Sequence, residues 1–277
     1  MRFRKIYVEI SNRCNLSCRF CPGTKRTPGR MEIERFSALL PKLRPYTDYL
    51  YFHVMGEPLC HPQLEQFLTL AGQAGFKVIL TTNGTLLAKQ REMLLGNPGL
   101  YKVNISLHAF EANDLAVPFE QYLDDCFAFG RAAAGSKLVV YRLWNQGGAD
   151  ALNTDIIARM KTHFTDPWVV EQKGTRVDQR VYLEYGEKFD WPDLDAPEGS
   201  GQFACRGLKD QIGVLWDGTV IPCCLDHEGD LVLGNLFESN LEEILSAPRA
   251  KAICDGFARG EAVEPLCRRC GYARRFE

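Results

Sequence analysis

Short apolar stretches alternate with amphipathic stretches along the first two thirds of the chain. The apolar stretches are rich in β-branched and aromatic residues, which is typical of strands, and they cover residues 6–10, 49–54, 77–81, 102–107, 137–143 and 168–171. Between them, apolar positions recur with helical spacing over residues 32–43, 62–74, 86–95, 119–134 and 152–164. This alternation predicts βαβ units, a parallel sheet and right-handed crossovers.

The pattern changes after residue 172. The stretch 173–204 is polar and rich in aspartate, proline and glycine, which predicts a connecting loop that covers part of a site. Further on, apolar residues at 212–216 and 219–222 flank Asp217-Gly218, a pair that favours a tight β-hairpin turn. A helix is expected over about 240–254. We therefore divide the chain into a core (1–172), a connecting loop (173–204) and a small C-terminal domain (205–277).

Three cysteines, Cys14, Cys18 and Cys21, lie on one short segment after the first predicted strand. Cysteine thiolates hold iron–sulfur clusters, and a 4Fe–4S cluster normally takes four protein ligands. A loop that offers three leaves one iron open to a ligand that is not protein, which indicates chemistry rather than electron storage. The alternatives are a zinc loop or unrelated buried thiols, but zinc sites usually pair two cysteines with two ligands further along the chain.

The run from Cys14 to Cys21, with Phe20 before the third cysteine, resembles the Cys-x3-Cys-x2-Cys signature of radical S-adenosylmethionine (radical SAM) enzymes. In that family the open iron binds S-adenosylmethionine (AdoMet), and the 5′-deoxyadenosyl radical released from it removes a hydrogen atom from the substrate. The resemblance implies an α/β fold, a partial (β/α)6 TIM-like barrel. The periodicity by itself leaves an open doubly wound sheet as an alternative.

The resemblance also implies which residues contact AdoMet. Met55-Gly56-Glu57-Pro58 resembles the family's Gly-Gly-Glu-Pro turn, with Met55 in place of the first glycine. Arg142, on the fifth strand, is a candidate partner for the AdoMet carboxylate, with a salt bridge at the barrel rim as the alternative. His108 stands where relatives often have an acid, so the role of that acid is not transferred. The predicted contacts are Phe20, Gly56, Glu57, Pro58, Asn83, Ser106 and Arg142.

A second cysteine set resembles the SPASM/Twitch extension of radical SAM enzymes, with an early cysteine, a hairpin with Gly-x4-Cys and a final Cys-x2-Cys. Its members are Cys205, Cys223, Cys267 and Cys270. Because the chain stops at Glu277, the resemblance implies the shortened Twitch form with one auxiliary 4Fe–4S cluster. Cys224 adjoins Cys223, and neighbouring side chains of an extended segment point in opposite directions; the spacing favours Cys223 as the ligand. A zinc ribbon is the alternative.

The net charge and the cysteine content of the chain indicate what the protein binds. The formal net charge is -2 over 277 residues, which gives no general case for nucleic acid or membrane binding. The basic stretch 25–30 is interpreted as a solvated face. No secretory leader is recognised and the chain has 11 cysteines, so we expect a cytoplasmic protein whose clustered cysteines bind metal.

These observations predict a radical SAM enzyme that carries out a two-electron oxidation of a small molecule, assisted by the auxiliary cluster. The alternatives are an enzyme that modifies a peptide or protein side chain, an iron–sulfur electron carrier or sensor, and an RNA-modifying enzyme. An electron donor such as flavodoxin or ferredoxin is the expected partner. No catalytic residue is assigned. Two interpretations of Asp226, His227 and Glu228 stay open: one of them accepts a proton, or the three only form a polar loop.

Overall fold

The computed structural model describes residues 2–172, 174–199 and 204–273, and every strand in them belongs to one sheet. The strands of its centre are β1 (Lys5–Val8), β2 (Tyr49–Tyr51), β3 (Lys77–Thr82), β4 (Leu100–Ser106), β5 (Leu138–Gln146), β8 (Val181–Glu187) and β9 (Gln211–Val214). The others are β6 (Val169–Glu171), β7 (Gly174–Asp178), β10 (Thr219–Ile221) and β11 (Gly234–Asn235).

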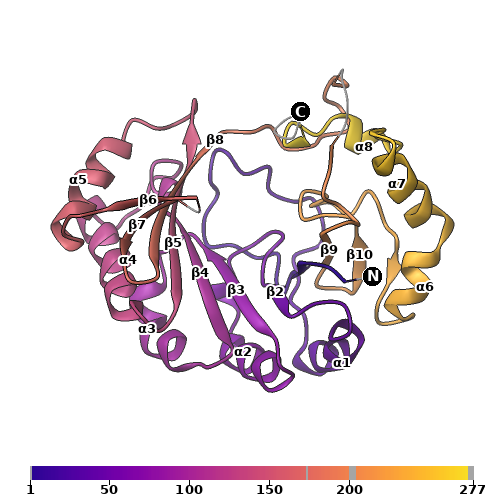
Figure 1. Cartoon of the computed structure of the whole chain (residues 1–277), viewed down its shortest axis with the longest axis horizontal. Coiled ribbons are helices and arrows are strands. Elements are labelled where there is room, and N and C mark those ends of the chain that lie inside the picture. Colours follow the sequence, from indigo (N-terminus) through magenta and orange to yellow (C-terminus); the bar gives the residue numbers. More distant parts are fainter. Residues whose placement is uncertain (1, 173, 200–203, 274–277) are drawn as a thin grey trace.

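The strand order is β11-β10-β9-β1-β2-β3-β4-β5-β8-β7-β6. All pairs from β9 to β8 are parallel, and the pairs at both ends are antiparallel. The sheet curves but, within the described residues, does not close on itself (Figure 1). The predicted partial barrel is therefore confirmed.

Helices cover the outside of the curved sheet (Figure 1). Their apolar faces, such as Phe36 and Leu39 of the first helix, are fully buried against strand residues such as Leu50. The predicted helices are confirmed with small shifts at their ends. They are α1 (Ile33–Leu43), α2 (Leu64–Gln73), α3 (Leu87–Gly96), α4 (Phe119–Ala133) and α5 (Asn153–His163).

The expected connecting loop over 173–204 was wrong for its first half, and the last parallel strand was misplaced. The predicted strand at 168–171 forms β6, but it lies at the sheet edge. The strand that pairs with β5 is β8, with Val139 opposite Val181. Val181 and Leu183 of β8 are buried, while Tyr182 and Glu184, which alternate with them, are only partly buried. This alternation is that of a strand with one apolar face, set in a stretch whose overall composition is polar.

The C-terminal part begins with the predicted hairpin, which is confirmed as β9 and β10. β9 also pairs in parallel with β1, so this part continues the barrel sheet. The helix expected over 240–254 is instead two helices, α6 (Leu241–Ser246) and α7 (Pro248–Ala258), followed by α8 (Pro265–Arg268). Pro248 explains the break, because proline has no N–H to continue a helix and favours its first turn.

The described part of the chain contains no helix of the length and hydropathy needed to cross a membrane.

Candidate functional site

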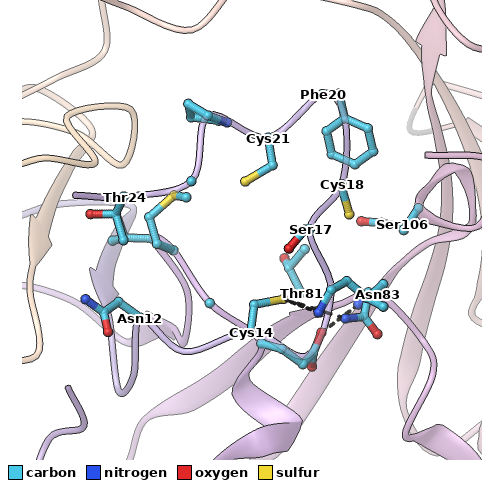
Figure 2. A pocket seen from close by; sticks show the side chains of 18 of the residues that line it. Asn12, Cys14, Ser17, Cys18, Phe20, Cys21, Thr24, Thr81, Asn83 and Ser106 are labelled. Carbon is cyan, nitrogen blue, oxygen red and sulfur yellow. Dashed lines mark hydrogen bonds between the residues drawn. The ribbon is translucent and has the colours of Figure 1, made fainter. Parts of the chain in front are cut away.

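The three N-terminal cysteines lie on the loop between β1 and α1 and line one cavity of about 340 Å³. Figure 2 shows Cys14, Cys18 and Cys21 around this cavity. Its other walls come from the turns after β2, β3 and β4, at the carboxyl ends of parallel strands, where barrel active sites are built. No group of three or more His, Cys, Asp and Glu side chains within residues 2–172, 174–199 and 204–273 is arranged to hold a single metal ion. The thiols surround a larger space.

These residues fit an iron–sulfur cluster in donor type and electrostatics. Burial raises the pKa of the Cys14 thiol to about 11 and also raises the pKa of Cys18 and Cys21. Without a cation the thiolates would be unfavourable there, and bound iron supplies that positive charge. Asn113 donates a hydrogen bond to the Cys18 sulfur at 3.1 Å, and the Asn83 amide nitrogen lies 3.9 Å from the Cys14 sulfur. Such hydrogen bonds stabilise thiolate ligands.

The turn at Gly56 and Glu57 is held tightly against the cysteine loop. The Glu57 N–H donates to the Arg13 carbonyl at 2.9 Å. The Glu57 carboxylate is buried and accepts hydrogen bonds from the N–H of Leu59 at 3.0 Å and of Asn83 at 2.7 Å. It therefore links the turn after β2 to the turn after β3.

Five of the seven predicted AdoMet contacts line the cavity with the cysteines, and they are Phe20, Gly56, Glu57, Asn83 and Ser106. Figure 2 shows Ser106 on the same side as Cys18, and Asn83 beside Cys14. The Asn83 side chain also donates to the side-chain amide oxygen of Asn15 at 2.9 Å. The Phe20 ring stacks near His108, with 5.0 Å between ring centroids.

Pro58 and Arg142 are not among the residues that line this cavity. Pro58 is buried and begins a short 3₁₀ helix at Pro58–Cys60. The Arg142 guanidinium lies 4.3 Å from the Trp144 ring centroid, and its Nε is 3.6 Å from a Glu184 carboxylate oxygen. Arg142 nevertheless pairs in the sheet with Ser106, so its backbone is next to the cavity wall.

Sequence patterns did not single out three residues that also line the cavity, Asn12, Thr24 and Trp191. Trp191 comes from the stretch expected to cover part of the site. Its ring contacts His227, with 5.4 Å between centroids. A tryptophan within a polar stretch was the one available signal, since large aromatics seldom stand free in solvent.

The four C-terminal cysteines gather in the part of the chain after β8. Cys205 precedes β9, Cys223 follows β10, and Cys267 lies in α8, three residues before Cys270. The thiol of Cys223 interacts electrostatically with Cys205 and Cys267, and that of Cys267 with Cys205 and Cys270. Burial raises the pKa of all three of Cys205, Cys223 and Cys267, so these thiols also suit a cationic cluster rather than free thiolates.

Cys224 interacts electrostatically with Cys223 and Cys205 but has a further partner outside this group. The Tyr7 hydroxyl donates a hydrogen bond to the Cys224 sulfur, and Tyr7 belongs to β1. Cys224 packs in a small cluster with Tyr7, Met55, Cys21 and Trp191. Cys224 therefore has contacts beside the first cysteine site, and Cys223 stays the predicted ligand of the second.

Asp226 holds its own loop and Glu228 contacts the cysteine loop, so neither carboxylate serves the cavity wall. The Asp226 carboxylate accepts the N–H groups of Asp230 at 2.9 Å and of Leu231 at 3.0 Å, which closes the loop. The Glu228 carboxylate accepts the N–H of Lys25 at 3.0 Å. Neither residue, nor His227, is among those that line the cavity.

Two family models match the chain. One, the radical SAM superfamily, matches residues 8–125, and the other, SPASM, an iron–sulfur cluster-binding domain, matches residues 205–271. The chain belongs to the radical SAM superfamily, with a SPASM-type domain after the barrel, and it is a radical SAM enzyme. The radical SAM domain implies AdoMet and an AdoMet-binding 4Fe–4S cluster, and the SPASM domain implies an auxiliary iron–sulfur cluster.

Among particular proteins, the S-adenosyl-L-methionine-dependent 2-deoxy-scyllo-inosamine dehydrogenase of Niallia circulans is 22% identical over 277 residues, which cover 97% of this chain and 92% of that protein. The tungsten-containing aldehyde ferredoxin oxidoreductase cofactor-modifying protein of Pyrococcus furiosus is 30% identical over 106 residues, which cover 37% of this chain and 30% of that protein.

Two solved structures resemble the whole fold. BtrN in complex with AdoMet and 2-DOIA has a TM-score of 0.65 and 19% identity, covering 98% of this chain and 93% of that chain. Streptococcus suis SuiB bound to S-adenosylmethionine has a TM-score of 0.66 and 15% identity, covering 98% of this chain and 72% of that chain. At these identities the likeness establishes the shared fold.

Proposed function

We propose that this radical SAM enzyme oxidises a small molecule by two electrons, removing hydrogen from a carbon that bears a hydroxyl or similar group. One observation carries the proposal. An open three-cysteine site and a separate four-cysteine site belong to one continuous sheet, in which β1 pairs with β9, so a possible electron acceptor is built into the same fold as the first site. The similarity to a dehydrogenase over 97% of this chain supports the same reaction class.

The roles proposed for the cysteines follow their grouping. Cys14, Cys18 and Cys21 would hold the AdoMet-binding cluster, and Cys205, Cys223, Cys267 and Cys270 would hold the auxiliary one. When bound, the first cluster supplies the electron that cleaves AdoMet, and the second offers an acceptor for an electron from the substrate. We keep the boundaries 1–172, 173–204 and 205–277 as a working division.

The cavity walls suggest how the chain orients AdoMet. An ammonium offers only donors, and the backbone carbonyls of the turn at Gly56 are the proposed acceptors. The Ser106 hydroxyl is suited to donate to a carboxylate, and Arg142, paired with it in the sheet, is the proposed ionic partner of the same group. Phe20 offers an aromatic face, and Asn83 and Glu57 hold neighbouring turns in place. Pro58 acts only by shaping its turn.

The partners follow from the chemistry. One-electron reduction requires an external donor, and flavodoxin or ferredoxin is the proposed class, in a cytoplasmic setting. The Niallia circulans relative is named for an amino cyclitol, so cyclic amino alcohols and related polyols are the proposed first substrates. A peptide substrate is less favoured, because the relative matched along nearly its full length is a dehydrogenase.

The test uses anaerobically reconstituted full-length protein. We expect about eight irons per chain and formation of 5′-deoxyadenosine from AdoMet after reduction with dithionite. Replacing Cys14, Cys18 and Cys21 together by alanine should leave about four irons and abolish 5′-deoxyadenosine. Cleavage of AdoMet by this triple variant would contradict the proposal.

Substrate oxidation is tested separately. Deuterated 2-deoxy-scyllo-inosamine and ring-deuterated polyols are incubated with the reduced enzyme and AdoMet. Transfer of deuterium into 5′-deoxyadenosine identifies the carbon that is attacked, and a product two hydrogens lighter identifies the oxidation. A product that keeps both hydrogens, such as an epimer, would replace oxidation by another radical reaction.

A further inference from the structure

One arginine of the basic stretch 25–30 is not solvated, contrary to expectation. The Arg26 side chain is only 13% exposed, and its partner Glu9 is fully buried, directly after β1. The two terminal guanidinium nitrogens of Arg26 donate to the two Glu9 oxygens at 2.8 and 2.7 Å. Such a two-fold contact is the strongest form of ion pair, and it fixes the orientation of both groups.

The Glu9 carboxylate also binds the turn that forms the AdoMet site. The N–H of Met55 donates to Glu9 Oε2 at 3.1 Å, and this oxygen also accepts from Nη2 of Arg26. Met55 precedes Gly56, which has φ +81° and packs against the backbone of Ser11 and Arg13 in the cysteine loop. Movement of the carboxylate would therefore move the turn at Gly56.

The third guanidinium nitrogen of Arg26 reaches the C-terminal domain. Its Nε donates to the His227 carbonyl at 2.7 Å, four residues after Cys223. Next to it, the Lys25 N–H donates to the Glu228 carboxylate at 3.0 Å. Figure 1 shows the loop after β1 lying between the barrel strands and the part that contains β9 and β10. The ion pair thus joins the cysteine loop, the AdoMet turn and the segment after Cys223.

We propose that Arg26 and Glu9 are positioning residues, which set the turn at Met55 and Gly56 for AdoMet and fix the cysteine loop against the C-terminal cysteine site. This inference rests on the proposed function, since it assumes that AdoMet binds at that turn. If the pair were needed only for folding, altering it would lower the stability of the protein, and AdoMet affinity would fall only as far as that loss of stability explains.

The test uses two conservative variants of the reconstituted full chain. Arg26→Lys keeps the charge but loses the planar fork, and Glu9→Gln keeps the shape but loses the charge. The matched control is Arg159→Lys, because Arg159 makes a similar two-fold contact with Asp124, at 2.8 and 2.5 Å, between the outer helices α5 and α4. Equilibrium dialysis with AdoMet, the paramagnetic resonance spectrum of the reduced protein with and without AdoMet, iron content and Tm are measured for each.

We expect both site variants to keep wild-type iron content, to bind AdoMet roughly tenfold more weakly and to show an altered AdoMet-induced change in the resonance spectrum. The control should match wild type in all three. Wild-type AdoMet affinity in both site variants would overturn the inference, and so would a loss of iron or of Tm that fully accounts for weaker binding. If wild type itself neither binds nor cleaves AdoMet, the proposed function fails, which is a different result.

A single change can leave a buried charge without its partner and prevent folding. In that case the double variant Glu9→Gln/Arg26→Met is tested in place of the single variant. This variant removes both charges together. Restored folding with AdoMet affinity still reduced supports the positioning role, whereas restored folding with wild-type affinity overturns it.

Discussion

Gly56 lies so close to Ser11 that a β-carbon on it would be 2.5 Å from the Ser11 carbonyl oxygen. The glycine also has φ +81°, a conformation that side-chain-bearing residues rarely adopt. Both facts explain why a glycine stands where the turn meets the cysteine loop.

Replacing Gly56 by alanine should push this turn away from the cysteine loop and lower kcat/KM by about tenfold to hundredfold, since small displacements at a reaction centre are costly. Gly147→Ala is the control, because Gly147 has φ +76° but an added β-carbon would meet nothing within 4 Å. Equal losses in both variants would show that backbone strain alone, not the contact with Ser11, matters.

Cys223 and Cys224 should respond oppositely to substitution by serine. Cys223→Ser removes a thiol that interacts with Cys205 and Cys267, so iron should fall from about eight to about four or five per chain. Cys224→Ser keeps a partner for the Tyr7 hydroxyl and should leave iron unchanged. Iron and sulfide analysis of the two purified variants decides this. Iron loss only in Cys224→Ser would reassign the ligand.

His108 should make stability depend on pH. Burial lowers the pKa of His108 from 6.5 to about 4, and its Nδ1 lies 3.0 Å from the Arg142 carbonyl oxygen. Below pH 6.5 the unfolded chain gains a proton that the folded protein does not, so the free energy of unfolding falls as pH falls towards 4.

Between pH 6.5 and 5.5 this loss should be about 1 kcal/mol. The variant His108→Gln has no group at this position that titrates in this range. Its free energy of unfolding, measured with urea at the two pH values, should therefore fall by about 1 kcal/mol less than that of the wild type. Parallel behaviour of the variant and the wild type would show that the histidine is not held neutral in the fold.

Gly130 should be irreplaceable for a purely steric reason. It lies in α4, where an added β-carbon would be 1.9 Å from the Tyr141 hydroxyl oxygen, and that hydroxyl donates to the Cys126 carbonyl at 2.9 Å. We expect Gly130→Ala to lower the free energy of unfolding by about 1–3 kcal/mol.

The control for this prediction is Gly96→Ala at the end of α3, where nothing lies within 4 Å of the added carbon. That change should be neutral or stabilising by up to about 1 kcal/mol. Urea unfolding followed by circular dichroism compares the two. Similar stability of both variants would mean that Tyr141 moves aside at little cost.

Much of the barrel could be predicted because its outer helices are amphipathic and its strands are apolar on at least one face. α1 and α5, for example, begin and end within one residue of their predicted bounds. β8 escaped prediction because Tyr182 and Glu184 alternate with its buried valine and leucine, so that its composition resembles a loop. The break at Pro248 was a signal in the sequence that the prediction of one helix did not use.

The grouping of Cys14, Cys18 and Cys21 around one cavity could be predicted because their spacing is visible in the sequence. The ion pair of Arg26 with Glu9 could not be predicted, since it depends on how the loop after β1 folds back. An arginine in a basic stretch also resembles a surface residue. Trp191 likewise reaches the cavity only through the path of the chain after β8.

The pairing of β1 with β9 bears on the order in which the molecule is made. Ile6 lies between Leu50 on one side and Ile212, which is synthesised about 200 residues later, on the other. Until Ile212 has been synthesised, β1 presents an unpaired edge, and the cysteine loop that follows it lacks the wall it later meets at His227. Unpaired edges promote association between chains. Iron delivery to the first site is therefore best suited to a finished chain, and a truncated one should aggregate.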